Sequence, residues 1–546
     1  MMEKHDGHVD RDSESGNVPA ESTEYNLAEQ HDQLARGLKS RHIQFLALGG
    51  AIGTGLFVGS GNILSATGPA PLFMAYLSMM LVVWVVMNSL AEMVTYLPMR
   101  GITVPYFVDR FVDPSLGFAA GWNYWYAYAM LIGAEATAAG IIIDYWGANV
   151  NIAVWITIVL LVILLLNIIA VSFFGEAEFW FASIKLITII GLIILGIVIF
   201  FGGGPNQDKV LGFHYWNDPG AFVDYKVAGP TGRFLGYWKA FVSAGFAFIT
   251  SPELIAIAAG ETIDPRRNIP KAARRFVWRL AVFYGLGSLV IGIMVPSNDP
   301  TLLGAAKEGK SDASASPFVI GIQNVGIPVL NHIVNAAILT SAWSAGNSFL
   351  YSGSRILYSM SLNGQAPKIF RHTNRNGVPW IAILATWAIG LLAYLNVSNS
   401  GSTVFTWFSN ISTISGFIAW IVVLITYLRF RRAMEFNNLL DCLPYRTPLQ
   451  PYVSYAALIV ISLLTITNGF HTFMPFSAQD FVAAYITIPI FLILYLGHKL
   501  WFRTALYIPV DKIDAVTGKK EMDELEAMEQ PRIAKNWLQK VWFWVA

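Results

Sequence analysis

The apolar residues of this chain occur in long, nearly uninterrupted blocks, and shorter polar stretches separate one block from the next. Each block is about 20 residues long, which is the length of an α-helix that crosses the hydrocarbon core of a bilayer. We therefore predict an all-α integral membrane protein with twelve transmembrane helices. The expected spans are residues 43–67, 70–97, 115–143, 152–172, 178–202, 237–260, 276–296, 325–350, 379–396, 404–428, 452–470 and 480–502.

Polar segments flank the membrane domain, which is expected to cover residues 41–503. Residues 1–40 are rich in Asp and Glu and lack the apolar core of a signal peptide, so we expect a disordered tail. The alternative is a regulatory segment, on which ubiquitin-ligase machinery would modify Lys4. The tail at 504–546 ends in cations mixed with tryptophans, which suits either an interfacial helix or a simple tail.

Composition agrees with a membrane protein and narrows the chemistry. Of the 546 residues, 55% are hydrophobic and only 13% are charged, and the net charge is +1. The one cysteine, Cys442, excludes an intrachain disulfide framework and a cysteine-based metal cluster. No Ser-His-Asp or Walker-type motif is visible, so we expect no enzyme activity, cofactor or metal. We also expect no nucleic-acid partner.

Lys and Arg are concentrated in the loops that follow even-numbered spans, and such loops face the cytoplasm. Twelve spans then place both termini in the cytoplasm. The short loop after span four, which carries Glu176 and Glu178, is a neutral exception. The cations on the even side are Arg100, Arg110, Arg266, Arg267, Lys271, Arg274, Arg275, Arg279, Arg355, Lys368, Arg371, Arg375, Arg429, Arg431, Arg432 and Arg446. The opposite side holds mainly Lys209, Lys226, Arg233, Lys307 and Lys310.

Two spans contain residues that interrupt a helix. Span one contains "GGAIGTGLF" at 49–57, and span six contains "AGFAFITSPEL" at 244–254. Glycine weakens a helix interior, and Pro252 lacks an N–H and disfavours helix at Ser251. The two interruptions occupy matching places if spans 1–5 and 6–10 are repeats, and five is odd, so the second repeat would be inverted. Such a pair is the best sequence indication of a transporter binding site.

The interruptions also suggest a ligand. Backbone groups freed inside a membrane must face a ligand or a wet cavity. The N-terminus of a half-helix suits a carboxylate, and the C-terminal carbonyls of another suit an ammonium group. Two such breaks facing each other would bind a zwitterion, which means an amino acid. The alternative is that the glycines only permit tight helix packing.

The stretch "RHIQFLALGGAIGTGLFVGSG" resembles the first-helix signature of fungal amino-acid permeases of the amino acid–polyamine–organocation superfamily. The resemblance continues through "SLAEM", "SIKLITI", "FAFITSPEL", "RRNIPKAARR", "TSAWSAGNS", "WFSNISTISG" and "ITNGF", over about residues 37–505. Within that family it is strongest to the proline permeases, at "RRFVWRL", "SPFVIGIQN" and "AAYITIPIFLILYLGHKL". The usual Gly-x-Glu of helix six is here Ser251-Pro252-Glu253.

The resemblance implies an inverted five-plus-five fold with helices one and six broken, two additional helices, and proton-coupled amino-acid uptake at the plasma membrane. The resemblance further implies that Lys185 and Glu253 are the proton-coupling residues. The substrate-binding residues are Ile52, Gly53, Thr54, Gly55, Glu135, Phe248, Ile249, Thr250, Ser251, Glu253 and Ser344.

Ionisable residues inside a membrane are functional candidates by default. Lys185 matches the fifth-helix lysine of proton-coupled relatives, and its burial disfavours the charged form, although a permanent structural cation is an alternative. Glu253 would take a proton or cap freed N–H groups, and Glu135 would face the cavity. Phe248 matches the aromatic lid of the family, with plain packing as the alternative. Glu92, near the inner end of span two, is interpreted as structural.

We therefore predict proton-coupled uptake of small neutral amino acids, with proline first, by alternating access. The alternatives are a permease for 4-aminobutyrate, a general amino-acid permease, or a non-transporting nutrient sensor of the same fold. The expected partners are the amino acid, the proton and the lipid bilayer.

Overall fold

The computed structural model is helical throughout the part of the chain that it describes. Apart from helices it contains there a single isolated bridge between Phe473 and Phe476. This confirms the predicted all-α class. The described residues are 53–98, 103–144, 146, 150–169, 171–249, 251–253, 256, 265–303, 316–397, 401–528 and 537, so the N-terminal tail at 1–40 lies outside them.

Seven long helices form most of the described bundle: α4 (Pro69–Tyr96), α6 (Pro114–Asp144), α7 (Ile152–Ile169), α8 (Val171–Phe200), α9 (Pro230–Phe248), α15 (Leu330–Leu362) and α17 (Gly401–Phe436). The shorter α-helices of the described residues are α3 (Ser60–Thr67), α5 (Val104–Phe111), α11 (Pro265–Leu280), α12 (Gly287–Met294), α14 (Pro317–Asn324), α16 (Trp380–Gly390), α18 (Tyr452–Thr467), α19 (Ala478–Tyr485), α20 (Thr487–Phe502) and α21 (Lys519–Met528).

Short π- and 3-10 segments link or extend these helices. The π-helical segments are η2 (Gly55–Gly59), η3 (Trp216–Gly220) and η4 (Ala281–Leu286). The 3-10 segments are η5 (Lys368–Arg371), η6 (Leu391–Val397), η7 (Leu440–Cys442), η8 (Phe470–Thr472) and η9 (Val510–Lys512).

Seven helical segments of the described chain are long and apolar enough to cross a membrane, and the pair α19–α20, bent by 43°, would make an eighth. The chain therefore has the helices of a multi-pass membrane protein. The count of twelve and the inverted repeat stay predictions.

The boundaries of several predicted spans differ from the helices. The span predicted at 237–260 contains α9, which begins at Pro230 and ends at Phe248, and the span predicted at 404–428 is α17, which continues to Phe436. The span predicted at 178–202 is α8, which begins at Val171, and the span predicted at 276–296 belongs to a helix that starts at Pro265. The span predicted at 325–350 is α15, which begins at Leu330 and continues to Leu362. Its last part is polar, but these side chains are buried against protein, and the Arg355 guanidinium lies 4.0 Å from the Tyr351 ring centroid. Hydropathy measures preference for lipid and misses such protein-buried turns.

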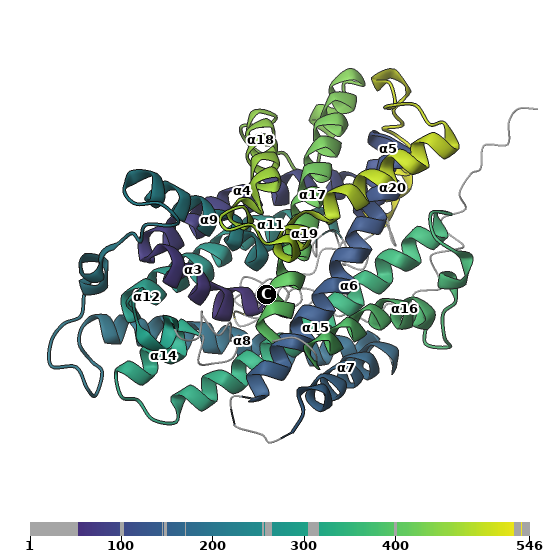
Figure 1. Cartoon of the computed structure of the whole chain (residues 1–546). Coiled ribbons are helices and arrows are strands. Elements are labelled where there is room, and N and C mark those ends of the chain that lie inside the picture. The colour runs from purple at the N-terminus through teal and green to yellow at the C-terminus, as the bar shows by residue number, and fades with distance from the viewer. Residues whose placement is uncertain are drawn as a thin grey trace, which may run out of the picture.

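Helix α6 runs through the middle of the bundle, with α17 toward the top of the view and α15, α16 and α7 beside its lower part (Figure 1). Glycines permit the close approach of its neighbours. A Cβ at Gly133 would lie 2.9 Å from the Phe408 ring, and one at Gly121 would lie 2.8 Å from the Met360 sulfur. Small residues at such contacts are what membrane helices use to pack tightly.

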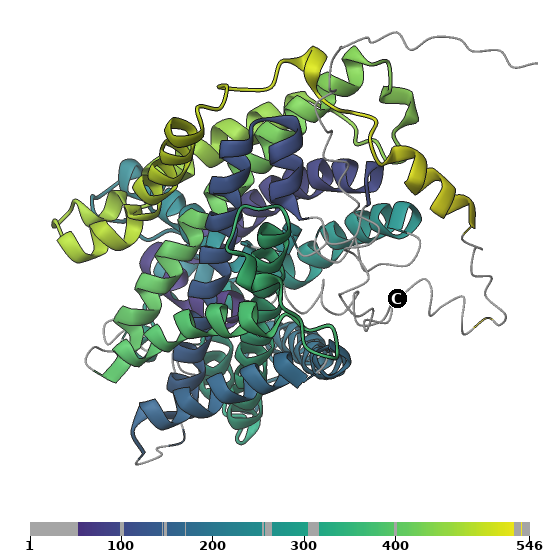
Figure 2. The ribbon, with the colours of Figure 1, turned by 90° about the vertical axis from the view of Figure 1, so that its right-hand side faces the viewer.

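The segment after α20 crosses one end of the bundle to reach α21 (Figure 2). The Tyr96 hydroxyl donates to the Ala515 carbonyl at 2.9 Å, and Arg110 forms an ion pair with Asp514 at 3.3 Å. Arg266 at the start of α11 pairs with Asp523. The cationic loops after predicted spans two and six therefore lie at the same end, as their charge pattern predicts. The described part of the predicted tail, residues 504–528, thus makes contacts with this end.

Candidate substrate and proton site

The first part of the site is the start of the helix at Thr54. A π-helical turn, Gly55–Gly59, follows this residue, and the Thr54 side chain does not cap it. The Thr54 hydroxyl donates instead to Glu135 Oε1 at 3.2 Å, and a Cβ at Gly53 would lie 3.3 Å from the same oxygen. The structure thus brings Gly53, Thr54 and Glu135 together. Ile52 lies outside the described residues.

Gly55 has a different environment from Gly53. A Cβ on Gly55 would lie 2.7 Å from the Ala247 Cα of α9, which is too close for any other residue. Its carbonyl accepts a hydrogen bond from the Tyr76 hydroxyl at 3.3 Å. Gly55 therefore permits the contact between η2 and α9, which is the packing explanation considered for the glycine-rich stretch.

The second part of the site is the end of α9 at Phe248. Ile249 has an extended backbone (φ −55°, ψ 148°), and Ser251, Pro252 and Glu253 are helical again. The predicted interruption of span six is therefore present at Ile249, three residues before a proline that cannot donate to a preceding turn. Thr250 lies outside the described residues.

Two hydroxyl groups, of Tyr284 and Ser251, lie at this break. The Ala247 carbonyl, in the last turn of α9, accepts a hydrogen bond from the Tyr284 hydroxyl at 3.0 Å. Ser251 is 1% exposed, and its hydroxyl has no partner in the described part of the chain. One carbonyl at the break is thus already used, while the Ser251 hydroxyl remains available to a ligand.

Phe248 is fully buried within a group of three aromatic rings. Its ring centroid lies 4.4 Å from that of Tyr284 and 5.7 Å from that of Tyr76. The ring therefore packs against α4 and η4. The expected role as a lid stays a prediction, and the contacts seen here are those of packing.

The third part is a group of buried charges on α6 and α8. Glu135, Glu178 and Lys185 are at most 2% exposed, and the Lys185 ammonium interacts electrostatically with both carboxylates. Glu178 and Lys185 are seven residues apart, which is two turns, so they lie on one face of α8. Ser344, predicted as a substrate ligand, donates to Glu178 Oε1 at 2.8 Å.

Glu178 is the residue that the sequence analysis missed, because it was assigned to the loop after span four. It lies inside α8, which starts seven residues earlier, at Val171. The spacing of seven residues from Lys185 is the signal that could have identified it. A carboxylate on the same helix face as a membrane lysine can partly compensate its charge, and Glu178 does interact electrostatically with Lys185.

These carboxylates retain free acceptor capacity. Within the described residues, Oε2 of Glu135 and Oε2 of Glu178 have no hydrogen-bond partner. Two carboxylates and one ammonium carry an excess of one negative charge, and an unpaired buried charge is costly. The group Glu135, Glu178 and Lys185 is therefore neutral only when it binds one proton.

Glu253 occupies a separate position just beyond the break in span six. The Tyr124 hydroxyl of α6 donates to Glu253 Oε1 at 3.4 Å, and Oε2 has no partner in the described part of the chain. The residue is 2% exposed. This leaves both expected roles open, since one oxygen is held and the other can accept a proton.

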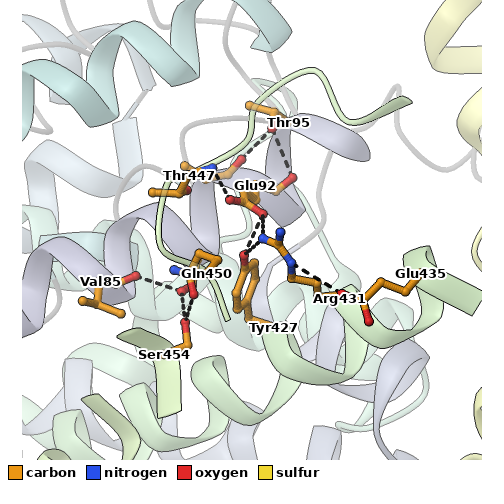
Figure 3. Close-up of polar contacts among 11 residues, drawn as sticks. Val85, Glu92, Thr95, Tyr427, Arg431, Glu435, Thr447, Gln450 and Ser454 are labelled. Carbon is orange, nitrogen blue, oxygen red and sulfur yellow. Dashed lines mark hydrogen bonds and ion pairs between the residues drawn. The ribbon is translucent and has the colours of Figure 1, made fainter. Parts of the chain in front are cut away.

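Glu92 has the opposite environment (Figure 3). Its Oε2 accepts from the Tyr427 hydroxyl at 2.7 Å, and its Oε1 accepts from the Thr447 backbone N–H. The Arg431 guanidinium lies 3.6 Å from Oε2. The carboxylate joins α4, α17 and the loop before α18, which agrees with its interpretation as a structural residue.

An all-helical membrane protein with a broken helix and a buried lysine–carboxylate group has the features of a secondary transporter. The model of the amino acid permease family matches residues 42–507, and the chain belongs to that family. The resemblance inferred from the sequence is thus confirmed.

Three relatives cover most of the chain. It is 58% identical over 519 residues to a proline-specific permease of Emericella nidulans, covering 95% of this chain and 94% of that protein. It is 55% identical to a probable proline-specific permease of Schizosaccharomyces pombe, covering 91% and 90%. It is 51% identical to a proline-specific permease of Saccharomyces cerevisiae, covering 91% and 81%. These relatives are permeases rather than enzymes.

Proposed function

We propose that this protein takes up proline across the plasma membrane together with protons, by alternating access. The names of the three relatives support the substrate. The single structural observation that supports the coupling is the hydrogen bond from Thr54, next to Gly53, to Glu135, a carboxylate that interacts electrostatically with Lys185. The proposed arrangement has twelve helices in an inverted five-plus-five repeat, with both termini in the cytoplasm.

The substrate carboxylate would bind at the start of the helix after Gly53. The first N–H groups of a helix have no partner within it, and here the side chain at the N-cap position does not supply one. The amine would bind carbonyl groups at the end of α9, other than that of Ala247, which Tyr284 occupies. Proline fits such a site because its protonated ring nitrogen has two N–H donors.

The position of Glu135 supplies a reason for coupling. A carboxylate bound beside Gly53 would lie close to the Glu135 carboxylate, and two like charges in a site of low dielectric constant repel strongly. Substrate would therefore bind best when Glu135 is protonated. Lys185 and Glu178 would hold the compensating charges while the proton moves. Glu253 would serve as a second proton acceptor at the other break.

Uptake of labelled amino acids by cells that lack their own permeases tests the proposal. We expect proline to be taken up best, increasingly as the external pH falls from 8 to 4, with alanine, glycine and 4-aminobutyrate as weaker competitors. Replacement of sodium should have no effect. Faster uptake of 4-aminobutyrate or of a bulky amino acid would overturn the proposed specificity. Absence of all uptake, with the protein at the cell surface, would favour the sensor.

The tails are proposed to be regulatory. Lys4 and the acidic segment around it would meet ubiquitin-ligase machinery in the cytoplasm. Replacing Lys4 by arginine should slow removal of the protein from the cell surface without changing uptake per molecule.

A further inference from the structure

A cavity of about 620 Å³ lies between α4, α11 and the loop that precedes α18. It is separate from the substrate site, at the end of the bundle where Glu92 binds the loop (Figure 3). Its lining residues are Trp84, Asn88, Arg274, Val277, Trp278, Pro444, Tyr445, Arg446, Thr447 and Pro448.

The wall of this cavity formed by the loop is held in place by hydrogen bonds. The Tyr445 hydroxyl donates to Asn88 Oδ1 at 2.6 Å, and the Thr447 backbone N–H donates to Glu92. Asn88 and Glu92 are one turn apart on α4 and are both buried. Because neighbouring positions of the loop are attached to one helix, the cavity exists before any ligand arrives.

The charges around the cavity are positive. Arg274 and Arg446 line it, and the Arg274 guanidinium lies 5.8 Å from the Tyr445 ring centroid. Among the described residues, the lining includes no Asp or Glu. Arg446 pairs with Asp441 at 2.9 Å, but the Asp441 side chain is 96% exposed, and such surface pairs contribute little. A phosphate can therefore replace Asp441 at low cost, and guanidinium groups bind phosphate in bidentate geometry.

Much of the remaining lining is apolar and adjoins exposed apolar and aromatic side chains. Trp84, Val277 and Trp278 contribute hydrocarbon and indole surface, and Trp278 is 76% exposed. Leu449 and Tyr452, immediately after the lining residues, are 70% and 79% exposed. Exposed tryptophan and tyrosine beside arginine are typical of the membrane–water interface.

We propose that this cavity binds the headgroup of an anionic phospholipid of the inner leaflet. Arg274 and Arg446 would contact the phosphate, while Trp84 and Trp278 would contact the glycerol region. Basic pockets between transmembrane helices on the cytoplasmic side bind such headgroups. The proposal uses the cytoplasmic orientation of the proposed function, but it does not depend on the identity of the transported amino acid.

The test is native mass spectrometry of the purified full-length protein with phosphatidylserine and, in parallel, phosphatidylcholine of the same acyl chains. We expect selective retention of phosphatidylserine. Replacing both arginines (Arg274→Gln with Arg446→Gln) should weaken phosphatidylserine retention roughly 30-fold, about fivefold for each cation. Asp441→Asn should strengthen it, because the competing carboxylate is lost. A matched control is Lys271→Gln, which removes a cation from the same helix outside the cavity and should change retention less than twofold.

Several outcomes would overturn the proposal. The proposal would be wrong if the double arginine variant retained phosphatidylserine as the wild type does. The melting temperature of that variant shows whether it is folded. Displacement of phosphatidylserine by millimolar inorganic phosphate would identify a soluble phosphate as the ligand. Stronger phosphatidylserine retention after deletion of residues 1–35 would identify the acidic N-terminal tail as the occupant. Proline uptake is measured separately, so failure of the lipid test leaves the transport proposal standing, and failure of transport leaves the lipid test valid.

Discussion

Buried glutamates of this protein lie in two opposite environments. One is the structural group, which consists of Glu92 with Tyr427, Arg431 and Thr447, and the other is the site group, which consists of Glu135, Glu178 and Lys185. In the structural group, Glu92 accepts hydrogen bonds on both oxygens and lies 3.6 Å from the Arg431 guanidinium. In the site group, Glu135 and Glu178 each use one oxygen and keep the other without a partner among the described residues.

The difference indicates how each group works. A carboxylate whose hydrogen-bonding capacity is filled stabilises one arrangement of helices, and protonation would remove a bond that the structure already makes. A carboxylate with an open oxygen can gain a proton or a ligand contact without breaking a bond. Burial alone does not separate the two cases, because Glu92 and Glu178 are both fully buried.

The largest effect is expected from Lys185→Met, which removes the one cation of the site group. Without it the two carboxylates must both be protonated to stay neutral, so proton binding and release lose their link to transport. Accumulation of proline in a pH gradient should fall by about tenfold for each pH unit of gradient, if one proton accompanies each substrate.

Measurement of the steady-state internal to external proline ratio checks this expectation. Lys209→Met removes an exposed lysine from a loop and serves as the matched control. A Lys185→Met protein that concentrates proline as the wild type does would make this residue a structural cation.

The second effect concerns the backbone beside the site group. Gly53→Val places a branched side chain at a position where even a Cβ lies 3.3 Å from Glu135 Oε1. It would fill the space proposed for the substrate carboxylate, at a cost of roughly 3 kcal/mol, or about 100-fold in uptake. Gly59→Ala, in the π-helical turn that follows, is the control, because a Cβ there meets nothing within 4 Å. The measurement is the initial rate of proline uptake per molecule at the cell surface. A normal rate for Gly53→Val would contradict the proposed carboxylate-binding site.

The third effect lies in the structural group. Glu92→Ala leaves the buried Tyr427 hydroxyl without its acceptor and leaves the half-buried Arg431 with Glu435, 3.9 Å away, as its remaining carboxylate partner. Removing one partner of a buried ion pair costs about 3–5 kcal/mol, and Glu435 recovers part of that cost. We expect a lower melting temperature and less protein at the surface, with the uptake per surface molecule preserved. A variant that melts like the wild type but loses proton-driven accumulation would place Glu92 in the coupling machinery and end the distinction between the groups.

The smallest effect is a dependence of stability on pH at a carboxylate outside the membrane spans. Burial in α5, followed by the charge of Asp113, raises the pKa of Asp109 to about 6. The folded state therefore prefers the protonated carboxyl group, and its stabilising contribution declines as the pH rises from about 4 through 6.

Asp109→Asn imitates the protonated form and should remove this decline. We expect the melting temperature of the variant to match the wild type near pH 4 and to exceed it above pH 6. A constant difference across this range would mean that Asp109 titrates normally in the folded protein.

The amino-acid sequence by itself determined the class of protein, because long apolar blocks have no stable place except a bilayer or a large core. It also identified the helix break around Pro252, since the missing N–H and the restriction on Ser251 are local properties of the chain. Glu135 and Lys185 were identified by their presence inside apolar spans, where an ionisable group is costly.

The tertiary structure alone decided which of these residues meet. Gly53 and Gly55 belong to the same motif, yet one faces Glu135 and the other faces Ala247, because successive helical positions point in different directions. Glu178 was missed and the polar end of α15 was left outside its span for one reason. A hydropathy scale measures only the preference of a residue for lipid over water. The interior of a helical bundle is a third environment, in which a polar side chain is stable when neighbouring helices supply its hydrogen-bond partner.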